Sequence, residues 1–303
     1  MYDLVSIGNI SLDTFYRGES LTYDAGRFKL AVGGKYFADF AKQALGGGGA
    51  NVAIGVSKHG LKTAVIGTIG NNPFKRTILL TLEEAGVSTE LCVIEDEYLN
   101  VSAILLTAKG EKTIVHYSTE HKGILRELER DQSTFKTKMF YLGNLPDVSI
   151  YERTRFVEKA KRQTIPVAVN LGVQDCRLPK TALRPLLTHL DILILNGHEF
   201  AELVKAQYKD IHFKEDIIGW YIPQLKHKHV IVTEGVRGSY LYFNSKVHHQ
   251  KSEEILEVTD TTGAGDGFTA GFLSSYLKGD RIEKAMKIAS EYAAKIIKKI
   301  GAN

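Results

Sequence analysis

The chain has 303 residues, 44% of them hydrophobic and 24% charged, which is typical of a folded protein with one large α/β domain or two smaller ones. The net charge is only +4 and the lysines are dispersed, which argues against a nucleic-acid partner. Two distant cysteines, no signal-like start and no run of about 18 apolar residues favour a cytoplasmic protein without a disulfide framework or a membrane partner.

Short apolar runs alternate with helical patterns along the chain, which predicts a mostly parallel sheet with helices on both faces. We expect strands at Leu4–Ile7, Thr63–Gly67, Met139–Leu142, Val167–Val169, Ile192–Leu195, Val230–Thr233 and Ser239–Phe243. We expect helices at Ala50–His59, Phe74–Glu84, Tyr151–Arg162, Lys180–Leu187, Phe200–Val204, Gly267–Leu277 and Ile282–Lys299. Several strands end in Gly, Asn or Thr, and ligands of open α/β sheets gather at the carboxyl ends of strands.

Two segments interrupt this alternation. Thr14–Leu45 contains β-like stretches, and within it Phe37–Leu45 has the composition of a short helix. Tyr98–Tyr117 has the pattern of a β-hairpin whose strands are joined near Lys109–Gly110.

The most informative motif is Asp260–Asp266, which reads Asp-Thr-Thr-Gly-Ala-Gly-Asp directly before a predicted helix. The small residues Gly263, Ala264 and Gly265 allow a sharp turn that presents backbone N–H groups at a helix N-terminus, where phosphate oxygens are attracted. Asp266 would lie in the first helical turn, where its carboxylate can take a proton from a hydroxyl that attacks a phosphoryl group. The motif therefore predicts phosphoryl transfer.

A second glycine cluster reads Gly-Gly-Gly-Gly-Ala-Asn over Gly46–Asn51, at the start of another predicted helix. Glycines such as Gly47 let a polar ligand approach the backbone closely. Asn51 offers both a donor and an acceptor to a substrate hydroxyl. Nearer the N-terminus, Asp13 follows the first strand, where a carboxylate can accept hydrogen bonds from two adjacent hydroxyls.

Both glycine motifs, in this order, resemble the two signatures of the PfkB/ribokinase family of sugar and nucleoside kinases. The resemblance implies a ribokinase-like three-layer α/β sandwich with a central mostly parallel sheet and a small β lid. It implies a single domain over residues 1–303, with the lid formed by residues 14–45 and 96–118. Pairing of lid edges between two copies would make a homodimer.

The same resemblance assigns further residues. Asn196-Gly-His-Glu199 is similar to the family's Asn-x-x-Glu motif, which implies nucleotide binding at Asn196 and a role for Glu199 in holding magnesium. The turn that contains Thr233, Gly235 and Gly238 resembles the family's ATP-binding turn. Asp260 resembles a position that contributes to a monovalent-cation site in some relatives, which implies possible potassium activation.

One strand end departs from the family pattern. Asn170 ends the strand Val167–Val169, where relatives often have Asp-x-Asn followed by Arg, but Ala168 and Gly172 occupy those two places. No role is therefore transferred to this strand end.

We therefore expect a kinase that transfers phosphate from ATP, with Mg²⁺, to a primary hydroxyl of a sugar or a sugar-like molecule. In this hypothesis Asp266 is the general base, Gly263–Gly265 stabilise the transferred anion, and Asp13 and Asn51 hold the acceptor. A nucleoside kinase of the same family is the alternative, and Phe28, Tyr36, Phe37 and Tyr117 are candidates for stacking on a base. A regulator that binds nucleotide without turnover is the alternative from another class.

Overall fold

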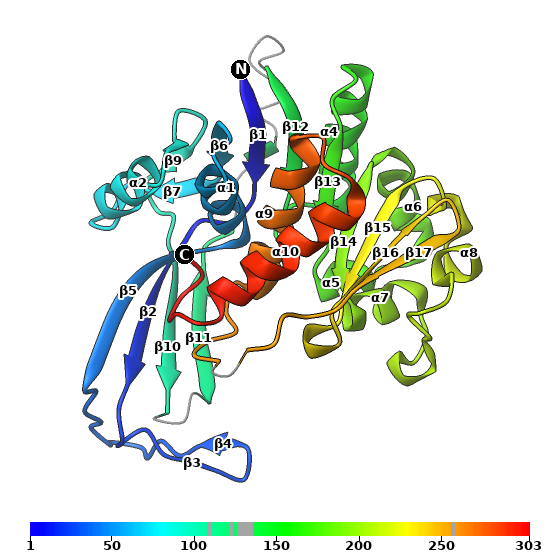
Figure 1. Ribbon diagram of the computed structural model, residues 1–303. Helices are drawn as coiled ribbons and strands as arrows, with labels where there is room; N and C mark the ends of the chain where they lie inside the picture. The colour runs from blue at the N-terminus through cyan, green and yellow to red at the C-terminus, as the bar shows by residue number, and fades with distance from the viewer. Residues whose placement is uncertain (108–110, 121–123, 126–135, 256–257) are drawn as a thin grey trace.

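A nine-stranded sheet forms the centre of the computed structural model, which describes residues 1–107, 111–120, 124–125, 136–255 and 258–303 (Figure 1). Its strand order is β17-β16-β15-β14-β13-β12-β1-β6-β8. The strands from β15 to β8 pair in parallel, and β16 and β17 add an antiparallel edge. The strands are β1 (Tyr2–Ile7), β6 (Thr63–Ile66), β8 (Val87–Ser88), β12 (Thr137–Leu142), β13 (Val167–Asn170), β14 (Ile192–Asn196), β15 (His229–Thr233), β16 (Ser239–Phe243) and β17 (Lys246–Gln250).

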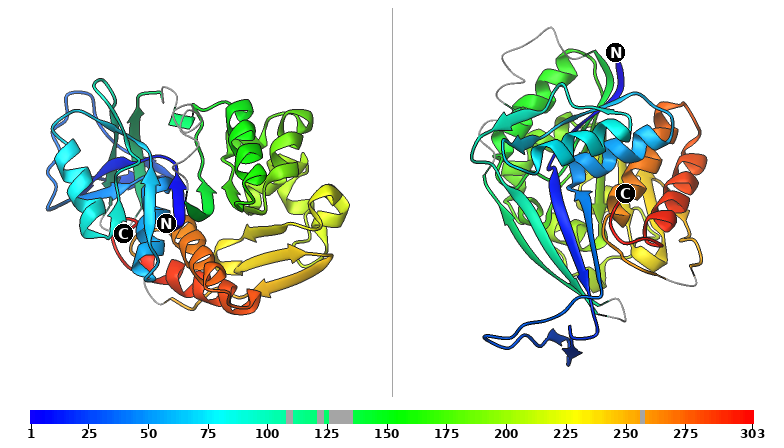
Figure 2. Two further views of the ribbon diagram at one scale, coloured as in Figure 1. Left: turned by 90° about the horizontal axis from the view of Figure 1, so that it is seen from above. Right: turned by 90° about the vertical axis from the view of Figure 1, so that its left-hand side faces the viewer.

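Helices cover both faces of this sheet, as Figure 2 shows from above. Side chains alternate along a strand, so Ile192 and Ile194 of β14 pack on one face and Leu193 and Leu195 on the other. The first face is covered by α1 (Gly48–Lys58), α9 (Ala264–Leu277) and α10 (Ile282–Ile296), and the second by α4 (Ile150–Arg162), α6 (Lys180–His189) and α7 (Gly197–Val204). The predicted three-layer α/β architecture is confirmed.

The remaining helices are short or peripheral. Within the described residues they include α2 (Lys75–Glu84), α5 (Val173–Cys176), α8 (Ile217–Tyr221) and the 3₁₀ turns η1 (Tyr208–Asp210), η2 (Pro223–Leu225) and η3 (Gly235–Arg237). In the part of the chain that the structure describes, none of the helices has both the length and the apolar character needed to cross a bilayer.

A second, four-stranded sheet lies beside the first, in the order β11-β10-β2-β5. Its strands are β2 (Ser11–Arg17), β5 (Phe40–Gly46), β10 (Asn100–Leu106) and β11 (Lys112–Ser118). The predicted hairpin is confirmed, because β10 and β11 pair antiparallel; its connection near Lys109–Gly110 lies outside the described residues. Figure 2 also shows the small pair β3 (Tyr23–Asp24) and β4 (Arg27–Phe28) projecting beyond this sheet, and β7 (Thr68–Gly70) pairs with β9 (Val93–Glu95).

The predicted strands and helices of the α/β core are present, with ends that differ by a few residues. The short helix predicted at Phe37–Leu45 is wrong, because Phe40–Gly46 is strand β5, paired antiparallel with β2. Alanine, lysine, glutamine and leucine favour a helix locally, but their alternating exposure suits one strand of a half-buried sheet. Antiparallel pairing with β2 runs along the whole segment and overrides that preference.

A close contact between α1 and α9 brings the beginnings of these two helices together. A Cβ atom added to Gly55 of α1 would lie only 2.4 Å from the Cβ atom of Ala270 on α9. The close approach of the two helices therefore requires glycine at position 55. The start of α1 at Gly48 and the start of α9 at Ala264 thereby lie at the same edge of the central sheet.

A buried ion pair holds the segment that follows β13. Arg153 of α4 is 2% exposed and donates two hydrogen bonds, of 2.7 and 2.5 Å, to the carboxylate of Asp175 in α5. A bidentate pair of this kind fixes both position and orientation. Because α5 begins three residues after the end of β13, the pair attaches this strand end to α4.

We predict that Arg153→Met lowers the free energy of unfolding by about 3–5 kcal/mol, because it leaves the Asp175 carboxylate buried without its partner. Lys284→Met is the matched control, since Lys284 pairs with Asp280 on the surface, and its removal should cost at most about 1 kcal/mol. Urea denaturation of both variants measures the difference. Equal losses would contradict a stabilising role for the buried pair.

Candidate active site

Polar residues follow the carboxyl ends of five neighbouring parallel strands. Asn9 follows β1, Asn144 follows β12, Asn170 ends β13, Asn196 ends β14 and Thr233 ends β15. The backbone carbonyl of Asn9 also accepts hydrogen bonds from the N–H groups of Gly49 and Ala50, which attaches the end of β1 to the start of α1. The ends of these strands are therefore one continuous polar edge.

A polar cavity of about 220 Å³ lies at this edge. It is lined by Asn9, Ser11, Gly47, Gly48, Asn100, His116, Tyr141, Asn144, Asn170 and Asp266. The second sheet contributes Ser11, Asn100 and His116, so the cavity lies between the two sheets. Its four asparagine amides can each donate and accept hydrogen bonds, which suits a ligand with several hydroxyl groups.

A second cavity, of about 170 Å³, is mostly apolar and lies on the other side of the α9 N-terminus. It is lined by Thr233, Gly235, Gly238, Ser239, Ser252, Glu253, Ile255, Ala264, Gly265, Phe268, Ser290, Ala293, Ala294 and Ile297. These residues come from the β15–β16 turn, α9, α10 and the segment after β17. An apolar slot with a few polar groups at its rim suits a flat aromatic ring.

The first turn of α9 joins the two cavities. Ala264 and Gly265 line the apolar cavity, whereas Asp266, the next residue, lines the polar cavity. Gly263 is the N-cap residue of α9, with φ of 76°, and a Cβ atom there would lie 2.2 Å from the Cβ atom of Ala302. Only glycine fits this position, and the helix N-terminus that follows attracts anions through its N–H groups and its dipole.

Asp266 is oriented by an amide from α1. Its Oδ2 atom accepts a 2.7 Å hydrogen bond from Nδ2 of Asn51, and Oδ1 of Asn51 accepts a 2.8 Å hydrogen bond from Nδ2 of Asn303. Burial raises the pKa of the Asp266 carboxyl above its usual range, and the hydrogen bond from Asn51 opposes that shift. A carboxylate with a raised pKa beside a cavity is a candidate general base.

Asn51 and Asp13 lie behind the residues that line the polar cavity. Asp13 is 8% exposed, and its Oδ1 atom accepts a 3.1 Å hydrogen bond from Ser11, which does line it. Burial raises the pKa of Asp13, and hydrogen bonds from Ser102 and Ser11 oppose the shift. The substrate contacts predicted for Asn51 and Asp13 stay predictions; the contacts present in the structure orient other polar groups around the cavity.

Asn196 and Glu199 form a capping box at the start of α7. The Asn196 side chain accepts from the Glu199 N–H at 2.9 Å, and the Glu199 carboxylate accepts from the Asn196 N–H at 2.8 Å. Burial raises the pKa of Glu199, while the hydrogen bond from Asn196 lowers it and the nearby Asp175 raises it further. The capping box places the Glu199 carboxylate beside the carboxyl end of β14, at the polar edge of the sheet.

Few of the described side chains at this edge of the sheet could coordinate magnesium. Within the described residues there is no cluster of three or more His, Cys, Asp or Glu side chains that could hold a metal ion alone. Magnesium keeps several waters and takes few protein ligands when phosphate oxygens are also present. One carboxylate, that of Glu199, is therefore compatible with a magnesium–nucleotide complex.

The turn after β15 is compact. The Glu234 N–H donates to the Gly238 carbonyl at 2.7 Å, and the Arg237 guanidinium contacts the Glu234 carboxylate at 2.6 Å. Thr233, Gly235 and Gly238 all line the apolar cavity, so three of the four residues predicted to bind nucleotide lie together, and Asn196 is not among the lining residues described.

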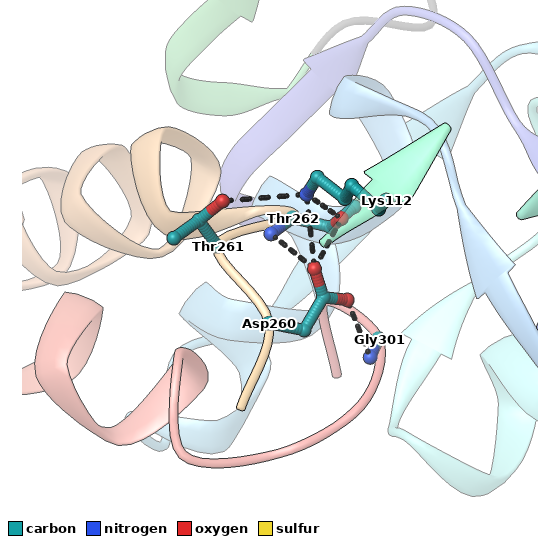
Figure 3. A network of polar contacts seen from close by, with 5 residues as sticks. All are labelled: Lys112, Asp260, Thr261, Thr262 and Gly301. Atoms are coloured by element: carbon teal, nitrogen blue, oxygen red, sulfur yellow. Dashed lines mark hydrogen bonds and ion pairs between the residues drawn. The ribbon is translucent and has the colours of Figure 1, made fainter. Parts of the chain in front are cut away.

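Asp260 lies at the centre of a polar network just before this turn of α9 (Figure 3). Its carboxylate accepts from the Thr262 N–H at 2.9 Å, the Thr262 hydroxyl at 2.7 Å, the Lys112 ammonium at 3.0 Å and the Gly301 N–H at 3.2 Å. Burial alone would raise the pKa of Asp260, but hydrogen bonds from Thr262, Lys112 and Gly301 outweigh it and lower the pKa.

Several lining residues were not identified from the sequence. Asn9 and Asn144 share a signal that could have found them, because each lies two residues beyond a predicted parallel strand, whereas Asn170 was named at a strand end but given no role. His116 and the α10 residues Ser290, Ala293 and Ala294 carry no comparable signal. Their positions depend on how the second sheet and α10 pack against α9.

Comparison with known proteins agrees with this geometry. Residues 5–303 match the family model described as pfkB family carbohydrate kinase. An uncharacterized sugar kinase of Archaeoglobus fulgidus is 28% identical over 254 residues, covering 82% of this chain and 96% of that protein. A nucleoside kinase of Methanocaldococcus jannaschii is 23% identical over 309 residues, covering 99% of this chain and 92% of that protein.

The fold is also similar to solved structures. The structure of Arabidopsis thaliana ribokinase complexed with ribose and ATP has a TM-score of 0.78 and 22% identity, and the match covers 99% of this chain and 94% of that chain. The predicted ribokinase-like fold is thereby confirmed. The chain belongs to the pfkB family of carbohydrate kinases, and it is a sugar or nucleoside kinase.

Proposed function

We propose that this enzyme transfers the γ-phosphoryl group of ATP to a primary hydroxyl of a sugar or a sugar-like molecule, with Asp266 as the general base. One observation carries this proposal: the first turn of α9 is shared by the apolar cavity and the polar cavity. A nucleotide in the first cavity and an acceptor in the second would meet at the N–H groups of residues 263–266.

The proposed reaction needs alignment and charge stabilisation more than covalent chemistry. The acceptor hydroxyl loses its proton to Asp266 as its oxygen attacks the γ-phosphorus, and ADP leaves. N–H groups of the Gly263–Gly265 turn stabilise the charge on the transferred group. Mg²⁺, held near Glu199 with the nucleotide phosphates, would neutralise phosphate charge, and Thr233, Gly235 and Gly238 would contact the nucleoside.

The lining of the polar cavity favours a polyhydroxyl acceptor over a nucleoside. Four asparagines line it, while Phe28, Tyr36, Phe37 and Tyr117, the aromatic residues suggested for base stacking, are absent from the described lining. Phe37 is 70% and Tyr117 59% exposed to solvent. A nucleoside acceptor, the second candidate, is supported by the relative from Methanocaldococcus jannaschii.

Closure of the second sheet over the acceptor would exclude water, which otherwise competes for the phosphoryl group. This sheet already supplies Ser11, Asn100 and His116 to the polar cavity. Pairing of two copies through the same sheet stays a prediction. Potassium at Asp260 also stays a prediction, and it would have to share that carboxylate with the Lys112 ammonium.

The first test measures magnesium-dependent ADP release from ATP with hexoses, ribose, keto-deoxy sugar acids and nucleosides as acceptors. We expect acceptor-dependent release with a sugar, and a loss of kcat on the order of 10²–10⁴-fold in Asp266→Asn, which keeps the shape but cannot take the proton. Release that is unchanged in Asp266→Asn would exclude this residue as the base. ATP binding without release for any acceptor would favour the non-catalytic regulator.

The Asn51–Asp266 hydrogen bond predicts a change in pH dependence. The base acts only when ionised, so kcat falls as the pH drops through the pKa of Asp266. Asn51→Leu removes the donor that opposes the upward shift of this pKa, so the acidic limb of the pH profile should move to higher pH.

The control for this experiment is Asn144→Ala, which changes the polar cavity without removing a hydrogen bond to Asp266. It should alter KM for the acceptor and leave the acidic limb in place. A uniform loss of kcat at every pH in Asn51→Leu would show that Asn51 does not set the pKa of the base.

Filling the apolar cavity should weaken nucleotide binding selectively. Ala294→Phe places a large ring in a cavity of about 170 Å³, so we expect KM for ATP to rise by about 10-fold or more with KM for the acceptor unchanged. Lys295→Phe adds the same ring at the next, exposed position and should have little effect. Equal KM values for ATP in the two variants would place the nucleotide elsewhere.

A further inference from the structure

The ammonium group of Lys112 lies in a cage of oxygen atoms next to the α9 N-terminus (Figure 3). Its Nζ atom is 3.0 Å from Oδ1 of Asp260, 3.3 Å from Oγ1 of Thr261 and 2.6 Å from Oγ1 of Thr262. An ammonium group has three N–H donors, so these three oxygens satisfy it completely. Lys112 is the first residue of β11 and lies 150 residues before Thr262 in the sequence.

The cage has the composition of a cation site. Asp260 is only 3% exposed, and a carboxylate at that depth is costly unless a positive charge and hydrogen bonds compensate it. The Thr262 hydroxyl donates to Asp260 and accepts from Lys112. The orientation of this hydroxyl therefore depends on the Lys112 ammonium as well as on the Asp260 carboxylate. Lys112 is 27% exposed in its side chain, so the ion pair is partly shielded from water.

The cage is also directly joined to the proposed transfer site. Thr262 precedes Gly263, the N-cap residue whose turn presents the N–H groups to the transferred phosphoryl group. A small shift of Thr262 would move those N–H groups, and positional errors of about 1 Å can reduce a rate by about 100-fold. Four residues further along β11, His116 lines the polar cavity, so one strand contacts both the segment before α9 and the polar cavity.

We propose that Lys112 is a positioning residue whose ammonium acts as a built-in monovalent cation, holding the Asp260–Thr262 segment and the second sheet in place for phosphoryl transfer. The effect of Lys112 on the rate rests on the proposed function. The effect of Lys112 on the stability of the segment rests only on the contacts of the cage. A potassium ion has the same charge as an ammonium group, a similar size, and the same preference for oxygen atoms. On this proposal, which replaces the prediction of potassium at Asp260, the native enzyme needs no added monovalent cation, and removing the Lys112 side chain creates a site that K⁺ or NH₄⁺ can fill.

The test compares the wild-type protein with Lys112→Ala in KCl, NH₄Cl, NaCl and choline chloride at equal ionic strength. For Lys112→Ala we expect kcat to fall by about 10- to 100-fold in NaCl or choline chloride and to recover at least partly in KCl or NH₄Cl, with little effect of the salt on the wild type. Lys284→Ala, which removes an exposed lysine from its pair with Asp280, controls for a general loss of positive charge.

A second readout does not require activity. The Tm of Lys112→Ala without substrates should be higher in KCl than in NaCl, and the Tm of the wild type and of Lys284→Ala should not change between the two salts. If no variant or wild-type protein phosphorylates any acceptor, the proposed function fails while this shift in Tm still supports the cage. Lys112→Gln, which keeps a hydrogen-bonding side chain but no charge, replaces Lys112→Ala if the latter does not fold.

Three outcomes would overturn the inference. One is a wild-type enzyme that itself requires K⁺, since its cation site would then not be filled by Lys112. Another is a Lys112 variant with full activity in choline chloride. The third is a Tm of the variant that responds to K⁺ and Na⁺ equally.

Discussion

The hydrogen bond between Asn51 and Asp266 depends on how closely α1 approaches α9, and the arrangement of the whole site depends on that approach. The two helices come from distant parts of the chain, and Gly55 against Ala270 lets their backbones lie close together. Both helices then begin at the same edge of the sheet. A Cβ atom added to Gly48 at the start of α1 would lie 3.4 Å from Oδ1 of Asp266. A bulky residue at position 55 would separate the amide from the carboxylate without touching either.

The parallel sheet places the other polar residues of the site. Parallel strands all end at one edge of the sheet. Polar residues that follow each strand therefore form a continuous surface there, although they are far apart in the sequence. Asn9, Asn144, Asn170, Asn196 and Thr233 are placed in this way. The antiparallel strands β16 and β17 do not extend this edge; instead Ser239 of β16, the segment after β17 and α10 line part of the apolar cavity.

The four-stranded sheet lines one side of the polar cavity and also contacts the segment before α9. Through β2, β10 and β11 it contributes Ser11, Asn100 and His116 to the cavity, and through Lys112 it contacts the segment before α9. A displacement of this sheet would therefore change the polar cavity and the turn before α9 together. Such a connection suits an enzyme that must avoid transferring phosphate to water before the acceptor is in place.

The sequence alone determined the alternation of strands and helices, the position of the turn at Asp260–Asp266 before α9 and the glycine-rich start of α1, because periodicity, turn chemistry and glycine content act over a few residues. Tertiary structure alone decided the strand at Phe40–Gly46, where pairing with β2 outweighed a local helical preference. It also decided the partners of Asn51, the lining of the apolar cavity by α10, and the cage around Lys112. Each of these joins residues that are far apart in the chain, and the energy of such contacts depends on distances that only the packing of both sheets and their helices defines.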